Sequence, residues 1–368
     1  MNIFVKKYLL KFFSVVFITI IFSSACTDKF DINQVISDLD SNNIGNIGDT
    51  LYIPQTPVWT GFNKPKDMIV GREPFIYVAD TDNDRIVMLN IAGQFLGEKS
   101  IKKPIALTQN YKLELIVVAE FDTVINNNNL TFSAVYKIDM VEANHIFANT
   151  KLQRILPQDP KVDPFAFNRT DRFYTGVCSF YDNSIFVSRK GPSNNNPVDR
   201  DNTIIQVEFD NANSTVVSKI PGLEPLATGL LSANEISSLT SFNSRSNDII
   251  VTLIGKNSFK VQWLEFVSNS DFEGYQSKLG AFSSSIMTVN KFGKPEDVAL
   301  DEANNIYVAD AEKDSVFKFN NFGDELESFG GSNMFSAPHA VAFHDRTLYV
   351  LDTNNDRILR FILSTEIN

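Results

Sequence analysis

The sequence contains few of the residues from which covalent cross-links and metal centres are built. Its 368 residues include two cysteines and three histidines. Two cysteines exclude a disulfide framework, and three histidines leave little for a zinc site. Acidic residues outnumber basic ones by 44 to 33, and no block of lysine and arginine interrupts this excess. The chain is therefore predicted to have no nucleic-acid partner, and acidic ligands are poor candidates.

The amino terminus has the pattern of a targeting segment. Lys6, Lys7 and Lys11 form a basic region that precedes an apolar run over residues 12–22. That run is shorter than the roughly 17 to 25 residues that a membrane-spanning helix needs. Residues 1–25 are therefore predicted to be a cleaved signal peptide, and the remaining chain would carry 30 basic and 44 acidic groups, a net charge of -14.

The segment from Ser23 to Cys26 places small residues before a cysteine and resembles the lipobox of bacterial lipoproteins. The common lipobox has leucine where this chain has Ser23. The resemblance implies a diacylglyceryl group on the thiol of Cys26 and an anchor in the bacterial cell envelope outside the cytoplasm, in the outer membrane. The alternative is an ordinary secretory peptide. Residues 26–50 are rich in Asp, Asn, Ser and Gly, which predicts a flexible tether. If Cys26 is lipidated, Cys178 is the remaining thiol, and we interpret it as a small buried hydrophobe.

Three segments of the remaining chain repeat one order of turn, strand, turn and strand. They are residues 65–89, 295–319 and 338–361, and each begins with proline. The first two share the sequence Ile-Tyr-Val-Ala-Asp, and the first and third share Asp-Arg-Ile after their turns. The spacing of 42 residues between Val308 and Val350 lies in the range of roughly 40 to 50 residues for one propeller blade.

These segments resemble NHL repeats, which build β-propellers. Weaker candidates for further blades begin at residues 115, 184 and 248, which makes six in all. The sequence therefore predicts an all-β fold over residues 51–368, with six blades of four antiparallel strands. Asn-rich and Pro-rich insertions are expected at residues 126–129, 144–170 and 192–201. A seventh, degenerate blade between residues 140 and 175 is the alternative count.

The repeats also predict how the ring closes and what their charged turns do. The last repeat supplies three strands, whereas a blade needs about four. Residues 51–55 are expected to provide the missing outer strand of the last blade. Asp80, Asp310 and Asp352 begin turns, where carboxylates accept backbone N–H bonds, and Arg85 and Arg357 are expected to pair with these acids. We interpret all five residues as structural.

The candidate binding residues follow the leading prolines and are expected near the mouth of the central channel. They are Lys66, Asp67, Glu296, Asp297 and His339, the last of which is followed by Ala340, with weaker equivalents at Thr175, Gly176, Ser237 and Ser238. The resembled family includes a lyase that holds zinc through histidines at such positions, but one repeat alone supplies a histidine here. Carboxylates suit calcium better, although no spacing demands a metal. The sequence therefore predicts no cofactor, with a calcium ion in the central channel as the alternative.

No Ser/His/Asp order, phosphate-binding glycine loop or heme cysteine pair occurs in the repeat region. This absence favours binding over catalysis. We expect a binding or assembly module for an envelope protein, a peptide or a glycan, attached to the membrane by its lipid. The alternative is a metal-dependent lyase or a lactonase-like hydrolase that uses Asp67, Glu296, Asp297 and His339.

Overall fold

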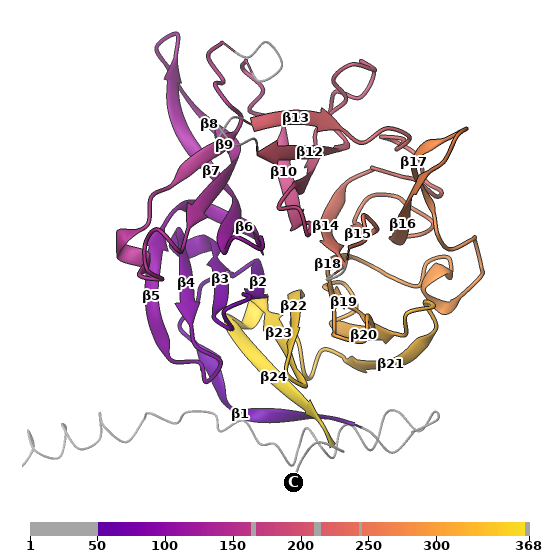
Figure 1. Cartoon of the computed structure of the whole chain (residues 1–368). Coiled ribbons are helices and arrows are strands. Elements are labelled where there is room, and N and C mark those ends of the chain that lie inside the picture. The colour runs from indigo at the N-terminus through magenta and orange to yellow at the C-terminus, as the bar shows by residue number, and fades with distance from the viewer. Residues whose placement is uncertain (1–50, 163–166, 210–214, 243–244, 365–368) are drawn as a thin grey trace, which may run out of the picture. The chain divides into compact units, whose positions relative to one another are not determined.

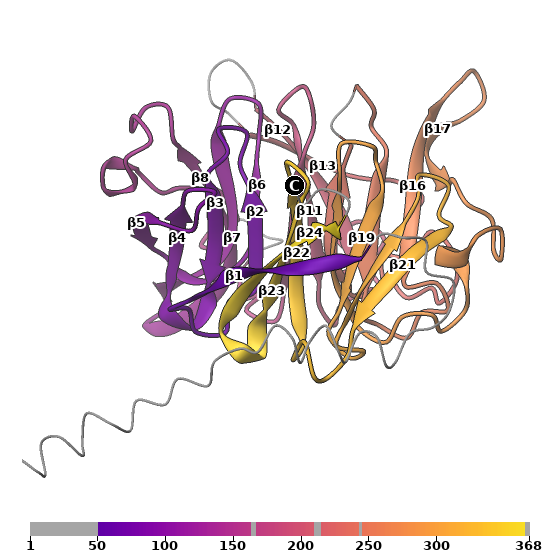
Figure 2. The same cartoon turned by 90° about the horizontal axis from the view of Figure 1, so that it is seen from below.

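The computed structural model describes residues 51–162, 167–209, 215–242 and 245–364, so the signal peptide, Cys26 and the tether lie outside the described residues. The described residues form six antiparallel sheets of four strands each, which are arranged as blades around a central axis (Figure 1). The predicted six-bladed propeller is confirmed. Among these residues there is no seventh sheet between residues 140 and 175. Viewed from the side, strands of the blades run along the axis (Figure 2).

The first three blades follow one another along the chain. Blade 1 contains β2 (Asp67–Val70), β3 (Ile76–Asp80), β4 (Arg85–Leu89) and β5 (Phe95–Ser100). Blade 2 contains β6 (Lys102–Gln109), β7 (Glu114–Ile125), β8 (Asn128–Asp139) and β9 (Gln153–Leu156). Blade 3 contains β10 (Phe173–Ser179), β11 (Ile185–Lys190), β12 (Thr203–Phe209) and β13 (Thr215–Lys219).

The other three blades complete the ring. Blade 4 contains β14 (Ile236–Ser241), β15 (Ile249–Leu253), β16 (Val261–Ser268) and β17 (Glu273–Ser277). Blade 5 contains β18 (Pro295–Leu300), β19 (Ile306–Asp310), β20 (Ser315–Phe319) and β21 (Glu325–Gly330). Blade 6 contains β22 (Pro338–His344), β23 (Thr347–Asp352), β24 (Arg357–Leu363) and β1 (Tyr52–Thr60). Four single 3-10 turns are η1 (Thr81–Asn83), η2 (Phe147–Asn149), η3 (Ser285–Met287) and η4 (Thr353–Asn355).

The second strand of a blade is apolar on both faces because it is covered by the neighbouring blades on both sides. Every residue of β3, β15 and β19 is buried. Val78 and Val87 of blade 1 pack in one cluster with Ala340 and Leu351 of blade 6. This two-sided burial explains why these strands read as continuous apolar runs and lack the alternation of a strand with one wet face.

The ring closes through the earliest strand of the chain. β1 pairs antiparallel with β24, so Tyr52 lies opposite Leu363 and Trp59 lies opposite Ile358. β1 is the outermost strand of blade 6, beside the carboxyl-terminal strand (Figure 1). The expected closure by residues 51–55 is confirmed, and the strand continues five residues past the expected Gln55.

Blade 2 accounts for part of what the sequence suggested was an insertion. The predicted extension at residues 126–129 is the tip of a long hairpin in which β7 and β8 pair along twelve residues each. The segment 144–170, in contrast, contains η2 and β9, the fourth strand of this blade. β9 was missed because it is short and its apolar residues do not alternate.

The charged turns have the predicted structural role. Arg85 Nε donates to Asp80 Oδ2 at 2.7 Å, and Arg357 Nε donates to Asp352 Oδ2 at 2.8 Å. Both acids are fully buried and each also accepts a backbone N–H from the loop that leads into its blade, from Asn63 and Ser336 respectively. Asp310 accepts the N–H groups of Gly293 and Lys294 in the same way. The predicted Asp–Arg pairs are therefore confirmed, and each lies within one blade.

Cys178 is buried in β10, and this burial raises the pKa of its thiol, as expected for a core residue rather than a nucleophile.

Among the described residues, no helix combines the length and the hydrophobicity needed to cross a bilayer.

Candidate functional site

The six inner strands enclose a cavity of about 340 Å³ on the propeller axis. All six blades contribute to its wall, through β2, β6, β10, β14, β18 and β22. Asp67 and Asp297 lie at the end where the inner strands begin, and Arg72, Glu302 and His344 lie at the end where they finish. Other polar residues of the wall are Thr108, Gln109, Ser179, Ser238, Thr240 and Ser241.

The two acids at the first end occupy equivalent positions in blades 1 and 5. Asp67 lies opposite Ala79 and Asp297 opposite Ala309 in their sheets. Asp67 Oδ2 accepts the N–H of Leu107 in blade 2 at 2.5 Å, and Asp297 Oδ2 accepts the N–H of Val341 in blade 6 at 2.9 Å. Each carboxylate thus connects its blade to the next one, and this contact alone explains an acid at the position.

The remaining carboxylate oxygens also have donors. Asp67 Oδ1 accepts the N–H of Met68 at 2.6 Å, and Asp297 Oδ1 accepts the hydroxyl of Ser238 at 2.7 Å. Burial raises the pKa of Asp67 well above its usual range, and the charge of Asp297 raises it further against the effect of the two N–H donors. Burial likewise raises the pKa of Asp297, while Val341 and Ser238 act in the opposite direction. The pair therefore holds protons at a pH where free carboxyl groups have lost them.

The raised pKa of these acids predicts a pH effect on folding. The pKa of an aspartate in the unfolded chain is near 3.9. The contribution of the two acids to folding stability is therefore fully present below that pH, and it is lost as the pH rises through their raised pKa values in the folded protein. We expect Asp297→Asn to gain stability relative to the wild type between pH 5 and pH 8, because the variant has no charge to bury. Urea unfolding of both proteins at the two pH values measures this difference.

Ser238→Ala provides the opposing variant for that measurement. It removes the hydroxyl that stabilises ionised Asp297, so the loss of stability with rising pH should become steeper than in the wild type. The raised pKa of Asp297 would be contradicted if the stability of Asp297→Asn relative to the wild type stayed constant or fell as the pH rises.

In blades 3 to 6, the residue before the position of the two acids lies in a β-bulge. The register between first and second strands shifts at Thr175 in β10, Ser237 in β14, Glu296 in β18 and His339 in β22. A bulge inserts an extra residue and re-aims its side chain. Thr175 and Ser237 use this position to bond the next blade, with hydroxyls that donate to the carbonyls of Ile236 and Pro295.

In blades 1, 5 and 6 the corresponding residues are charged or titratable and form a cluster. Lys66 Nζ lies 3.0 Å from His339 Nε2, and Glu296 Oε1 lies 3.8 Å from the same nitrogen. Glu296 also contacts the ammonium of Lys294. Burial lowers the pKa of His339 to about 4 and lowers the pKa of Lys66. At neutral pH the imidazole is therefore neutral, and its Nε2 can accept a hydrogen bond from Lys66.

The structure divides the five predicted site residues into two groups. Asp67 and Asp297 line the axial cavity, whereas Lys66, Glu296 and His339 are not among the residues that line it. A bulge re-aims Glu296 beside Asp297 in blade 5 and His339 in blade 6, whereas Lys66 stands before β2, which pairs with β3 without a register shift. Asp67 and Asp297 thus lie on the cavity wall, and Glu296 and His339 lie in the cluster with Lys66.

The carboxylates that would hold a calcium ion in the channel already have protein partners. All four oxygens of Asp67 and Asp297 accept hydrogen bonds from protein donors, and Glu296 is paired with Lys294 outside the cavity wall. Calcium takes six to eight oxygen ligands. Within the described ranges, no three His, Cys, Asp or Glu side chains lie together in a way that could hold a metal ion.

The sequence reasoning missed several polar residues deeper in the channel. Gln109, Ser179 and Ser241 stand three places after Ala106, Gly176 and Ser238, the positions equivalent to the two acids. Ser241 Oγ donates to the carbonyl of Ser179, and Ser179 Oγ donates to the carbonyl of Gln109, so one chain of hydrogen bonds crosses blades 4, 3 and 2. Alignment of the weak middle repeats with the strong ones could have located these residues. His344, which lies outside the repeat motif, also lines the cavity.

The sequence matches no protein-family model and no curated protein. Solved structures do match the fold, and they are six-bladed propellers. A putative gluconolactonase is 13% identical, with a TM-score of 0.53 over 86% of this chain and 93% of that one. The PQQ-bound aldose sugar dehydrogenase of Streptomyces coelicolor is 11% identical, with a TM-score of 0.55 over 87% and 100%. An auxiliary nutrient binding protein of Bacteroides thetaiotaomicron is 10% identical, with a TM-score of 0.54 over 82% and 70%. Likeness at this identity shows the fold alone.

Proposed function

We propose that this chain is a binding module of the NHL-repeat type, anchored by lipid at Cys26 to the outside of a bacterial membrane, which recognises a glycan or a peptide through its axial cavity. The matched structures include enzymes and a nutrient binding protein, so the fold is compatible with binding. The cavity of about 340 Å³ is at the lower end of the range of small-molecule sites, roughly 300 to 1,000 Å³. Its size suits one sugar unit or one side chain of a larger partner.

One observation carries the choice of binding over catalysis. The cavity wall is rich in hydroxyl and amide groups, whereas the two acids at one end of it, Asp67 and Asp297, are bonded to the backbone of the neighbouring blades. Hydroxyls and amides donate and accept hydrogen bonds without a proton transfer, so they recognise polar ligands. Acids that hold the ring together are poorly placed to act as nucleophile or base.

The test is occlusion of the cavity. Thr240 of β14 lines the cavity and is only partly buried, so Thr240→Phe should fill the cavity without removing a hydrogen bond that joins blades. Saturation-transfer NMR with neutral mono- and disaccharides and with short peptides identifies a binding class, and titration of the best binder gives its affinity. We expect Thr240→Phe to weaken that affinity by about tenfold or more, because the phenyl ring would occupy the cavity and remove contacts between the ligand and the wall.

Ser268→Phe is the matched control for that test. Ser268 ends β16 of the same blade and is exposed, so this variant adds the same ring away from the axis. Equal affinity of the wild type and Thr240→Phe, or the absence of any binder in both classes, would contradict the proposal. Metal analysis addresses the alternative of a metal-dependent lyase or lactonase, which requires stoichiometric calcium or zinc that is lost with Asp67→Asn.

The lipid anchor gives a separate prediction. Two or three acyl chains at about 0.8 kcal/mol per buried methylene hold a protein stably on a membrane. Cys26→Ser removes the thiol, so the variant should move from the membrane fraction to the soluble fraction and lose incorporation of an alkyne-labelled fatty acid. Cys178→Ser is the matched control and should keep both properties. A Cys26→Ser protein that still carries label would show that the lipobox resemblance is misleading.

A further inference from the structure

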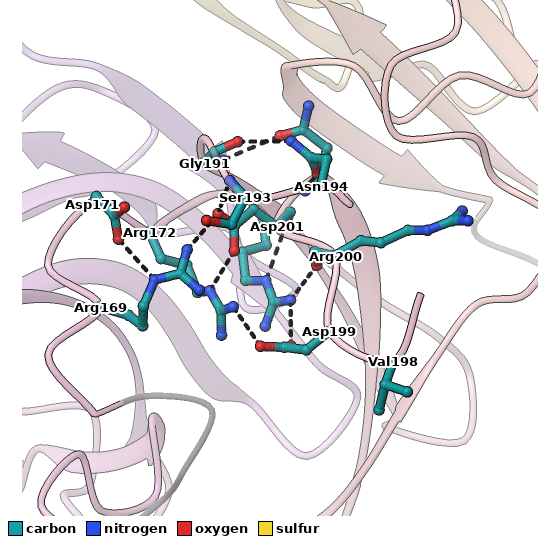
Figure 3. Close-up of polar contacts among 12 residues, drawn as sticks. Arg169, Asp171, Arg172, Gly191, Ser193, Asn194, Val198, Asp199, Arg200 and Asp201 are labelled. Carbon is teal, nitrogen blue, oxygen red and sulfur yellow. Dashed lines mark hydrogen bonds and ion pairs between the residues drawn. The ribbon is translucent and has the colours of Figure 1, made fainter. Parts of the chain in front are cut away.

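A second cavity of about 300 Å³ lies between blades 2 and 3, apart from the axial one. Four cationic side chains and one carboxylate line it, and they are Arg169, Arg172, Arg189, Lys219 and Asp199. A wall with this balance is unexpected in a chain whose net charge is -11. Figure 3 shows that the arginines converge on two aspartates of the loop that connects β11 to β12.

The two aspartates hold the cations in place. Asp199 Oδ2 accepts from Arg172 at 2.5 Å, and Asp199 Oδ1 accepts from both Arg189 and Lys219 at 3.0 Å. Asp201, which has no exposed surface, accepts from Arg169 at 2.5 Å and from Arg172 at 2.8 Å. The residues in contact come from three separate stretches of the chain. Their hydrogen bonds hold the guanidinium groups in place at the cavity wall.

The cluster has one positive charge that its own acids do not balance. Among the described residues, its four cations contact three carboxylates. Two of these are Asp199 and Asp201, and the third is Asp171, which pairs with Arg169. Arg200 stands apart and faces Glu224. Burial, and after it the neighbouring charge of Arg172, lower the pKa of Arg189, while Asp199 acts in the opposite direction. A bound monoanion would make the cluster neutral.

The rest of the wall favours an organic ligand over a bare ion. Its apolar part includes Leu156, Pro157 and Ile205, and Ser133, Gln158 and Tyr174 add polar atoms. Val198 and Val217 also line the cavity, with 66% and 43% of their surface exposed. Apolar faces beside a few polar groups are typical of small-molecule sites.

We propose that this cavity, defined as the blade 2–3 pocket, binds a hydroxylated monocarboxylate of sugar size, such as a uronic acid. Guanidinium groups form strong charge-assisted hydrogen bonds with carboxylates, as Arg169 and Arg172 already do with Asp199 and Asp201. The single surplus charge matches one carboxylate, whereas a phosphate dianion exceeds it. The inference is independent of the axial cavity, because no residue is shared between the two.

The test is titration calorimetry of the full-length protein with D-glucuronate and with D-glucose. Glucuronate should bind at one site, at least about tenfold more tightly than glucose, because its carboxylate adds a charge-assisted contact. Lys219→Met removes the surplus charge at a side chain that is 35% exposed, so the fold should persist. We expect this variant to lose glucuronate affinity by about tenfold.

Lys99→Met is the matched control for this variant. Lys99 also stands on the outermost strand of a blade, β5, and its ammonium also donates to a backbone carbonyl, that of Thr150. This variant should keep the wild-type affinity. Equal affinity for glucose and glucuronate, tighter binding of galactose 6-sulfate than of glucuronate, or the same affinity in both lysine variants would overturn the proposal. Binding that persists in Thr240→Phe would place the ligand in the blade 2–3 pocket and not in the channel.

Discussion

Tyr52→Ala is expected to lower the free energy of unfolding by about 3 to 5 kcal/mol, the usual cost of removing a large buried aromatic side chain. Tyr52 is 2% exposed and belongs to β1, the strand that closes the ring. Its ring stacks on Phe329 at 5.0 Å, and its hydroxyl lies 2.9 Å from the hydroxyl of Tyr307. Both partners belong to blade 5, so one side chain connects the closing strand of blade 6 to its neighbour.

Urea unfolding followed by fluorescence measures this loss, with two variants for comparison. Tyr52→Phe keeps the ring and removes the hydroxyl, which also accepts from Lys318, so it should cost about 1 kcal/mol. Tyr181→Ala makes the same truncation at a tyrosine that is 42% exposed and should change stability by less than about 0.5 kcal/mol. If Tyr52→Ala were no more destabilising than Tyr181→Ala, β1 would not contribute to closure as the structure indicates.

Asp201→Asn is expected to destabilise the fold by about 3 to 5 kcal/mol, because it leaves buried guanidinium groups without their carboxylate. The side chain of Asp201 has no exposed surface, and it also accepts the N–H of Ser193 at 2.7 Å in addition to two arginines. Asparagine has nearly the same size, so the change tests charge and hydrogen bonding rather than packing.

Asp171→Asn is the comparison for this second substitution. Asp171 pairs with the same Arg169, but its side chain is 50% exposed, so solvent replaces the lost contact and the cost should stay below about 1 kcal/mol. Thermal unfolding of both variants measures the difference. Equal losses in the two variants would show that the arginine cluster contributes little to stability.

Much of the fold could be predicted because its signals are local. The strands of blades 1, 5 and 6 were located from two-sided apolar runs, and the pairs of Asp80 with Arg85 and of Asp352 with Arg357 follow from turn chemistry within five residues. The closing role of β1 followed from a count of three strands in the last repeat. The short strand β9 was missed, since four residues with no alternation carry little periodic signal.

The candidate site was predictable only in part. Position after the leading proline located Asp67 and Asp297 on the channel wall. It also grouped them with Lys66, Glu296 and His339, which do not line the cavity, and a bulge re-aims the last two. A bulge depends on the register in which the first strand of a blade pairs with the second. That register cannot be predicted from the sequence of the first strand alone. The functional roles of all five residues remain predictions.

The sequence alone determined the all-β class, the six blades and the closing strand, because period, turn residues and repeat spacing are properties of neighbouring residues. Only the tertiary structure decided where charge gathers. The overall acidity of the chain disfavoured acidic ligands, yet folding brings Arg169, Arg189 and Lys219 from three different stretches into one pocket, where cations outnumber carboxylates among the described residues. Net charge averages over the whole surface, whereas recognition depends on the few side chains that folding brings within contact distance.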